Sequence, residues 1–163
     1  MKTRSIVTSM ALLALLAFGA GCDDDNPASP TSTTQEARVR VLHASPDAPN
    51  VDVLVDGKVV LTDVPFKGYS GYLTVPAGAR NFKVRATSDP TLVVINVTPT
   101  LAANKDYTVI ARNTVSTIEP WLLTDNNSKP ATGNIKVRLV HGAPGAPTVD
   151  IYITAPGADL TAA

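Results

Sequence analysis

The sequence predicts an all-β protein, an antiparallel β-sandwich followed by the first two strands of a truncated second copy. Three observations support this prediction. Short apolar segments are separated by turn residues at intervals of about 8 to 12 positions, which is typical of sandwiches. Prolines are frequent, valine and threonine are abundant, and few segments favour helix. Finally, a stretch of 18 residues occurs twice.

The repeat sets the domain boundaries. Residues 38–55, RVRVLHASPDAPNVDVLV, recur 98 positions later as residues 136–153, KVRLVHGAPGAPTVDIYI, without a gap and with eight identical positions. A period of this length suits one small β-sandwich domain and is too long for a solenoid unit. We therefore expect a β-sandwich domain over residues 37–133 and an incomplete second repeat over residues 134–163.

The N-terminal segment has the features of an export signal. Lys2 and Arg4 are followed by an apolar run over residues 6–20, which is short for a membrane span. The small residues before Cys22, the only cysteine, resemble a bacterial lipobox, although Gly19 stands where that motif usually has leucine. The resemblance implies a lipoprotein signal peptide over residues 1–21, cleavage before Cys22, and acylation of Cys22. An ordinary secretory signal with an incidental cysteine is the alternative.

Residues 22–36 are predicted to be the lipidated cysteine and a disordered tether. The segment DDDNPASPTSTTQ contains no large apolar residue and could span up to about 40 Å when extended. Its acidic triplet resembles lipoprotein sorting signals, whose meaning differs between bacterial lineages. We expect a cell-envelope protein held by its lipid at the outer membrane or cell surface rather than at the inner membrane.

The sandwich domain divides into about eight strands. Period-two alternation marks the first two, and Asp56-Gly57 then predicts a two-residue hairpin turn. The apolar run 92–97 suggests a central strand, whereas Pro120 suggests that the last strand is an edge strand or contains a bulge. The predicted strands are 38–43, 51–55, 58–62, 69–75, 82–86, 92–97, 107–111 and 118–123.

One spacing favours an immunoglobulin-like arrangement of these strands. Leu101 and Tyr107 lie six residues apart, a spacing similar to the tyrosine corner of fibronectin-type sandwiches. In that motif the phenol forms a hydrogen bond with nearby backbone. A core tyrosine without this role is the alternative.

Three motifs resemble the domain of unknown function 4397 family. They are the HASPDAPNVDV stretch at 43–53, VPAG at 75–78, and DYTV at 106–109, and the likeness resumes at Lys136. The resemblance implies an immunoglobulin-like β-sandwich that occurs, often in tandem, in bacterial lipoproteins and other cell-surface proteins. It implies no chemistry, because no activity is established for the family.

Candidate ligand residues lie within the repeat. A metal site could use His43, Asp47 and Asp52, but the second copy keeps only His141 and Asp150 and has Gly145 in place of Asp47. That ligand set is thin, so no metal or other cofactor is predicted. A hydrolytic triad from residues two positions apart is also disfavoured. The alternative is structural: the histidine would bond to the stiff, proline-rich loop beside it.

Two further groups of residues could have either a functional or a structural role. Arg40 and Asp52 recur together and could form a diagonal surface pair on adjacent strands. The aromatic residues Phe66, Tyr69, Tyr72 and Trp121 could form a sugar-binding face, or could belong to the core and rim.

Charge and motifs narrow the function classes. Fourteen basic residues balance fourteen acidic residues, so no nucleic-acid partner is predicted. No convincing catalytic arrangement is present, and we predict a protein that is not an enzyme. The sequence favours a lipid-anchored envelope protein that contacts the membrane through its N-terminal lipid. Its structural or interaction sandwich could contact a cell-surface protein or a glycan. The alternative is a glycan- or metal-binding module at the cell surface.

Overall fold

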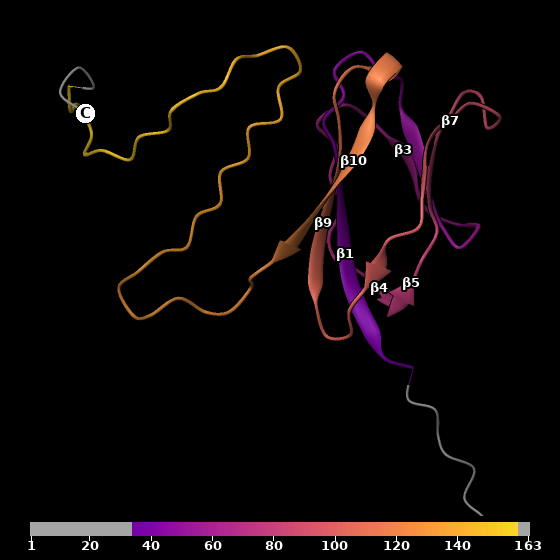
Figure 1. Ribbon diagram of the computed structural model, residues 1–163, viewed down its shortest axis with the longest axis horizontal. Helices are drawn as coiled ribbons and strands as arrows, with labels where there is room; N and C mark the ends of the chain where they lie inside the picture. The colour runs from indigo at the N-terminus through magenta and orange to yellow at the C-terminus, as the bar shows by residue number, and fades with distance from the viewer. Residues whose placement is uncertain (1–33, 160–163) are drawn as a thin grey trace, which may run out of the picture. The chain divides into compact units, whose positions relative to one another are not determined.

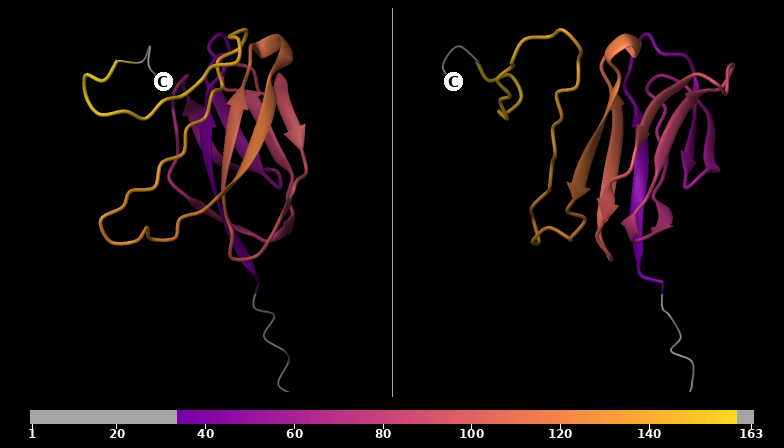
Figure 2. Two further views of the ribbon diagram at one scale, coloured as in Figure 1. Left: turned by 60° about the vertical axis from the view of Figure 1, so that its left-hand side comes forward. Right: turned by 45° about the vertical axis from the view of Figure 1, so that its right-hand side comes forward.

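Two four-stranded sheets face each other in the computed structural model, which describes residues 34–159 (Figure 1; Figure 2). Sheet A has the order β10-β9-β1-β4, and sheet B has the order β3-β2-β6-β7. Two short strands, β5 and β8, form a third pair. The elements are β1 Glu36–His43, β2 Val51–Val55, β3 Lys58–Val64, β4 Leu73–Pro76, β5 Gly78–Ala79, β6 Phe82–Ala86, β7 Val93–Val97, β8 Thr100–Leu101, β9 Asp106–Arg112, the 3₁₀ helix η1 Val115–Thr117 and β10 Glu119–Asp125.

This architecture confirms the predicted all-β sandwich. The hairpin turn is also confirmed: Asp56 and Gly57 both have positive φ, and Val55 pairs with Lys58 across the turn. The predicted strand over residues 69–75 is shorter than expected. Its regular part is β4, and Tyr69 contributes only an isolated bridge to Leu42.

One strand pair departs from the predicted antiparallel pattern. β1 pairs antiparallel with β4 but parallel with β9, from Arg38 opposite Asp106 to His43 opposite Ala111. After β1 the chain crosses to sheet B, so β1 and β9 are far apart in sequence and are not joined by a hairpin. Strands without a hairpin connection are free to run in the same direction.

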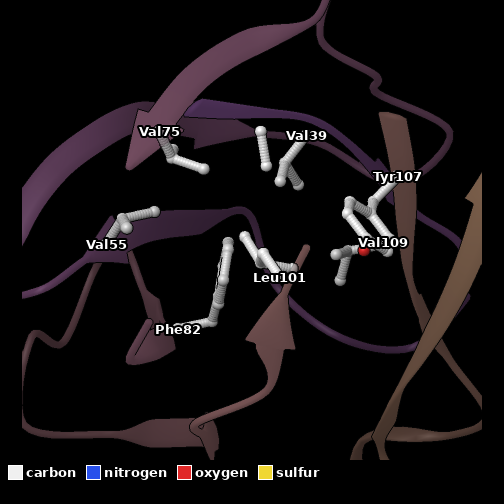
Figure 3. Close-up of a cluster of buried hydrophobic side chains, with 8 residues drawn as sticks. Val39, Val55, Val75, Phe82, Leu101, Tyr107 and Val109 are labelled. Atoms are coloured by element: carbon white, nitrogen blue, oxygen red, sulfur yellow. The ribbon is translucent and has the colours of Figure 1, made fainter. Parts of the chain in front are cut away.

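The core lies between the sheets and draws on both. Sheet A contributes Val39, Val75, Tyr107 and Val109, and sheet B contributes Val55 and Phe82, with Leu101 of β8 between them (Figure 3). The Tyr107 hydroxyl accepts a hydrogen bond of 3.0 Å from the amide of Ala102. The predicted bond between the phenol and nearby backbone is therefore present, in a position that ties β9 to the loop before it.

Two predictions about edge strands had opposite outcomes. β10, which contains Pro120, is an edge strand of sheet A, as predicted. The prediction that residues 92–97 form a central strand is wrong, because β7 is an edge strand of sheet B. Its apolar run is not buried throughout: Val93 is exposed and Ile95 is buried. A continuous apolar run therefore did not distinguish a central strand from an edge strand here.

The predicted strands of the second repeat are not formed. Residues 134–159 contain no strand and run as a plain trace in Figure 1. A strand needs a neighbouring strand for its backbone groups, and two isolated strands are marginal in water. The predicted signal peptide and Cys22 lie outside the described residues. Within residues 34–159, no helix is long and apolar enough to cross a membrane.

Candidate functional site

His43 is buried at the end of β1, where both of its ring nitrogens are bonded to its own loop. Nε2 lies 3.2 Å from the carbonyl oxygen of Pro49, and Nδ1 accepts a hydrogen bond of 3.4 Å from the amide of Ser45. A carbonyl can only accept and an amide N–H can only donate, so the bonds assign the ring proton to Nε2. Phe66 packs against the ring edge-on, with centroids 6.4 Å apart. This geometry matches the structural interpretation of the motif.

Asp47 connects this loop to a distant segment. Its Oδ1 atom accepts a 2.8 Å hydrogen bond from the amide of Val115, 68 residues later, and lies 3.5 Å from the Ser45 hydroxyl. Val115 begins the 3₁₀ helix η1, whose first amide groups have no partner within the helix. The carboxylate therefore fastens the repeat loop to the turn between β9 and β10.

Asp52 lies on β2 in sheet B, where it is buried and has hydrogen-bond partners different from those of His43 and Asp47. Its carboxylate accepts hydrogen bonds from the amide of Asp63 at 3.1 Å, the hydroxyl of Thr87 at 2.9 Å, and Arg85 at 3.4 Å. The Asp63 amide is the main reason that the pKa of Asp52 lies below its usual value, followed by the Thr87 hydroxyl. The carboxylate holds β3, β2 and the end of β6 together.

The predicted diagonal pair of Arg40 and Asp52 is wrong. Arg40 lies on β1 in sheet A, where it bonds to Thr108 at 2.8 Å, whereas Asp52 lies on β2 in sheet B. The connection between β1 and β2 crosses from one sheet to the other, so these strands are not neighbours. In the first copy each of the two residues bonds within its own sheet.

The three residues weighed as metal ligands thus have separate roles. His43 bonds to its loop, Asp47 to η1, and Asp52 to sheet B. Across residues 34–159 there is no group of three or more His, Cys, Asp or Glu side chains that could hold a metal ion.

The second copy keeps one of these contacts. His141 Nε2 lies 3.3 Å from the carbonyl oxygen of Pro147, the counterpart of the bond between His43 and Pro49. His141 and Asp150 are nevertheless exposed. The histidine-to-loop bond is therefore a local property of the repeat sequence, and burial depends on the rest of a sandwich.

A polar network that sequence reasoning missed covers the outer face of sheet A. Asp125 is its centre: Oδ2 accepts from the hydroxyls of Tyr72 and Thr108, both at 2.6 Å, and Arg40 lies 3.7 Å away. Arg138, the counterpart of Arg40 in the second copy, bonds to Oδ1 of Asp125 at 2.6 Å. Both copies of the same arginine thus contact one buried carboxylate, through pairings that alternation along single strands does not reveal.

A second carboxylate, that of Asp106, belongs to the same polar network as Asp125. Asp106 accepts hydrogen bonds from Arg38 at 2.6 and 2.7 Å and from Asn127 at 2.6 Å. The bond to the Arg38 guanidinium, more than any other contact, holds the pKa of Asp106 below its usual value. The charged groups of this face are therefore engaged with one another.

The four aromatic residues do not make one open platform. The guanidinium groups of Arg38 and Arg40 lie over the Tyr72 ring, at 5.3 and 5.1 Å from its centroid. Trp121 is covered in the same way by an arginine, and Phe66 lies beside His43. Only Tyr69 of the four is largely exposed, at 82%.

A cavity of about 310 Å³ opens into the sandwich between the edge strands β7 and β10. Its buried floor comes from both sheets, and Thr98 is the only lining residue with a polar side chain. Four lining residues are half-buried and mark the side of the cavity toward solvent: Val97, Pro99, Pro120 and Leu122. The floor is formed by Val41, Val109 and Ala111 of sheet A, and Val53, Phe82, Val84 and Ile95 of sheet B.

The cavity is bounded by short side chains. Facing sheets lie about 10 Å apart, and the lining residues, five of which are valine, leave part of that space unfilled. The apolar walls offer water almost no hydrogen-bond partners.

The sequence profile described as "Domain of unknown function (DUF4397)" matches residues 37–152. The chain belongs to this family. The match continues past β10 and includes most of the second copy of the repeat. A search of curated proteins found no match. Among solved structures, the chain is similar to the N-terminal domain of AlgF from P. aeruginosa, with 21% identity and a TM-score of 0.40 over 56% of this chain and 95% of that one.

Proposed function

We propose that this family member is a lipid-anchored protein of the cell envelope whose β-sandwich has a structural or interaction role and no catalytic one. The anchor rests on the sequence around Cys22. The role of the sandwich is supported by the histidine of the repeat, the residue type most often used in catalysis. Its nitrogens are occupied by the loop that the repeat itself encodes.

One observation carries the interaction role. Three apolar residues of β1 and three of β2 are at most 7% exposed, whereas their counterparts in the second copy are 45–86% exposed. Neighbouring exposed apolar residues of this kind mark a surface that interacts with a protein or a membrane. The exposed counterparts are Ile135, Val137, Leu139, Val149, Ile151 and Ile153.

The anchor is tested by Cys22→Ala in cells that produce the full chain. The variant should lose metabolic labelling with a fatty acid and move from the detergent phase to the aqueous phase, because no acyl chain can be attached. Gly19→Leu is the control, since it supplies the usual lipobox residue and should retain both properties. If Cys22→Ala still carries a fatty acid and stays in the detergent phase, the lipoprotein assignment is wrong.

The interaction role is tested in the same cells with a photo-cross-linking residue. At position 139, within the apolar row, it should give adducts with another protein or another copy of this chain. At position 92, an exposed leucine outside the row, it should give none. Equal yields at both positions would contradict a specific interaction surface.

A further inference from the structure

We propose that the cavity between the two sheets is a binding site for an unbranched aliphatic chain, such as the acyl chain of a fatty acid or lipid. The cavity holds about 310 Å³, at the lower end of the range of small-molecule sites. It is formed by the sandwich domain itself, so the inference does not depend on the proposed anchor.

The walls select the chemistry of the ligand. No charged side chain lines the cavity, and the single polar one, Thr98, is exposed beside the opening. A ligand with polar groups along its length would lose hydrogen bonds with water and gain none from the walls. An alkyl chain makes only van der Waals and hydrophobic contacts, which these walls supply, and its polar head can stay in water at the opening.

The position of the opening makes entry possible without unfolding. The floor residues Val84, Ile95 and Ala111 are buried, whereas Val97, Pro120 and Leu122 at the rim are half-buried. The rim residues belong to β7 and β10, one edge strand from each sheet. An alkyl chain can therefore slide in end-first between two edge strands, and no central strand has to move.

The test uses the full chain with Cys22→Ala, so that no attached lipid can compete, and calorimetry with laurate below its micelle-forming concentration. We expect saturable binding. Laurate should also shift the NMR methyl signals of Val84 and Ile95 on the floor, and leave those of Val75, which is buried elsewhere in the core. Absence of saturable binding, or shifts spread evenly over all buried methyl groups, would overturn the proposal.

Ala111→Leu provides the variant test. The added side chain points into the cavity, so laurate affinity should fall by about tenfold or more while the melting temperature stays the same or rises. Ala86→Leu is the matched control: Ala86 is equally buried but does not line the cavity. It should lower the melting temperature by overpacking and leave laurate affinity within about twofold. Equal loss of affinity in both variants would overturn the site.

Two further measurements separate the sources of the chain. If the protein sediments with phosphatidylcholine vesicles and Ala111→Leu abolishes this, the ligand is the acyl chain of a membrane lipid. If the protein binds laurate but does not sediment with the vesicles, the ligand is a free fatty acid. Both results support the site. Self-association that excludes laurate and is abolished by Ala111→Leu would instead show that a strand of another molecule of this protein fills the cavity. That result would overturn the proposal.

Discussion

At the scale of single residues, the repeat motif is a set of bonds within and between loops. His43 and Pro49 bond within the loop, whereas Asp47 reaches Val115 and Asp52 reaches Asp63. The local bond was expected from the sequence, since histidine and the loop are neighbours in the chain. The two aspartate contacts were not, because their partners are 68 and 11 residues away and carry no matching signal.

His43→Ala should lower the free energy of unfolding by about 1–3 kcal/mol, because the buried Ser45 amide loses its hydrogen-bond partner. Thermal or denaturant unfolding measures this. His141→Ala is the matched control, since the same bond to a proline carbonyl lies on an exposed segment. It should leave the unfolding curve unchanged. Equal effects in both variants would contradict the role of burial, and no effect in either would contradict the structural role of the motif.

Asp52 should make stability depend on pH. Its folded-state pKa is depressed, chiefly by the Asp63 amide, so its contribution to stability is present above the unfolded value of about 3.9 and is lost as pH falls through the folded pKa. Asp52→Asn should therefore lower the melting temperature at neutral pH and reduce its drop under acid conditions. Asp150→Asn, at the exposed equivalent position, should leave the melting curve of the sandwich unchanged. An unaltered acid profile in Asp52→Asn would refute the assignment.

At the scale of elements, the two copies of the repeat show what context adds to sequence. Both copies alternate apolar and polar residues, yet β1 and β2 are strands and residues 136–153 are not. The first copy has β9, β4, β3 and β6 as neighbours, which supply hydrogen bonds to its backbone. The second copy has side-chain contacts such as that of Arg138 with Asp125. Alternation therefore predicts a strand only where partner strands exist.

The same substitution in the two copies tests this difference. Val39→Ala should cost about 1–3 kcal/mol, because Val39 is fully buried in the core. Val137→Ala, at the equivalent position, is 58% exposed and should cost less than about 0.5 kcal/mol. Hydrogen exchange should likewise be fast for the amides of 135–141 and slow for those of β9. Slow exchange in 135–141 would show that the second copy is already part of a sheet.

At the scale of the whole molecule, the sandwich is held by pairings that join distant parts of the chain. β1 lies between β9 and β4, and the cavity lies between the sheets on the side of the edge strands β7 and β10. Valine is the most frequent residue of the buried core, as expected because β-branched side chains favour strands.

The sequence by itself determined the properties that depend on near neighbours. Alternation marked most strands, Asp56-Gly57 marked the hairpin, the spacing of Leu101 and Tyr107 marked the tyrosine corner, and the repeat motif marked the family. Only the tertiary structure decided which sheet each strand joined, that β1 runs parallel to β9, that Arg40 and Asp52 are apart, and that a cavity is present. The physical reason is that strands pair through backbone groups that every residue carries. Side-chain pattern therefore determines which face of a strand is buried, whereas its neighbours are chosen by the packing of the whole chain.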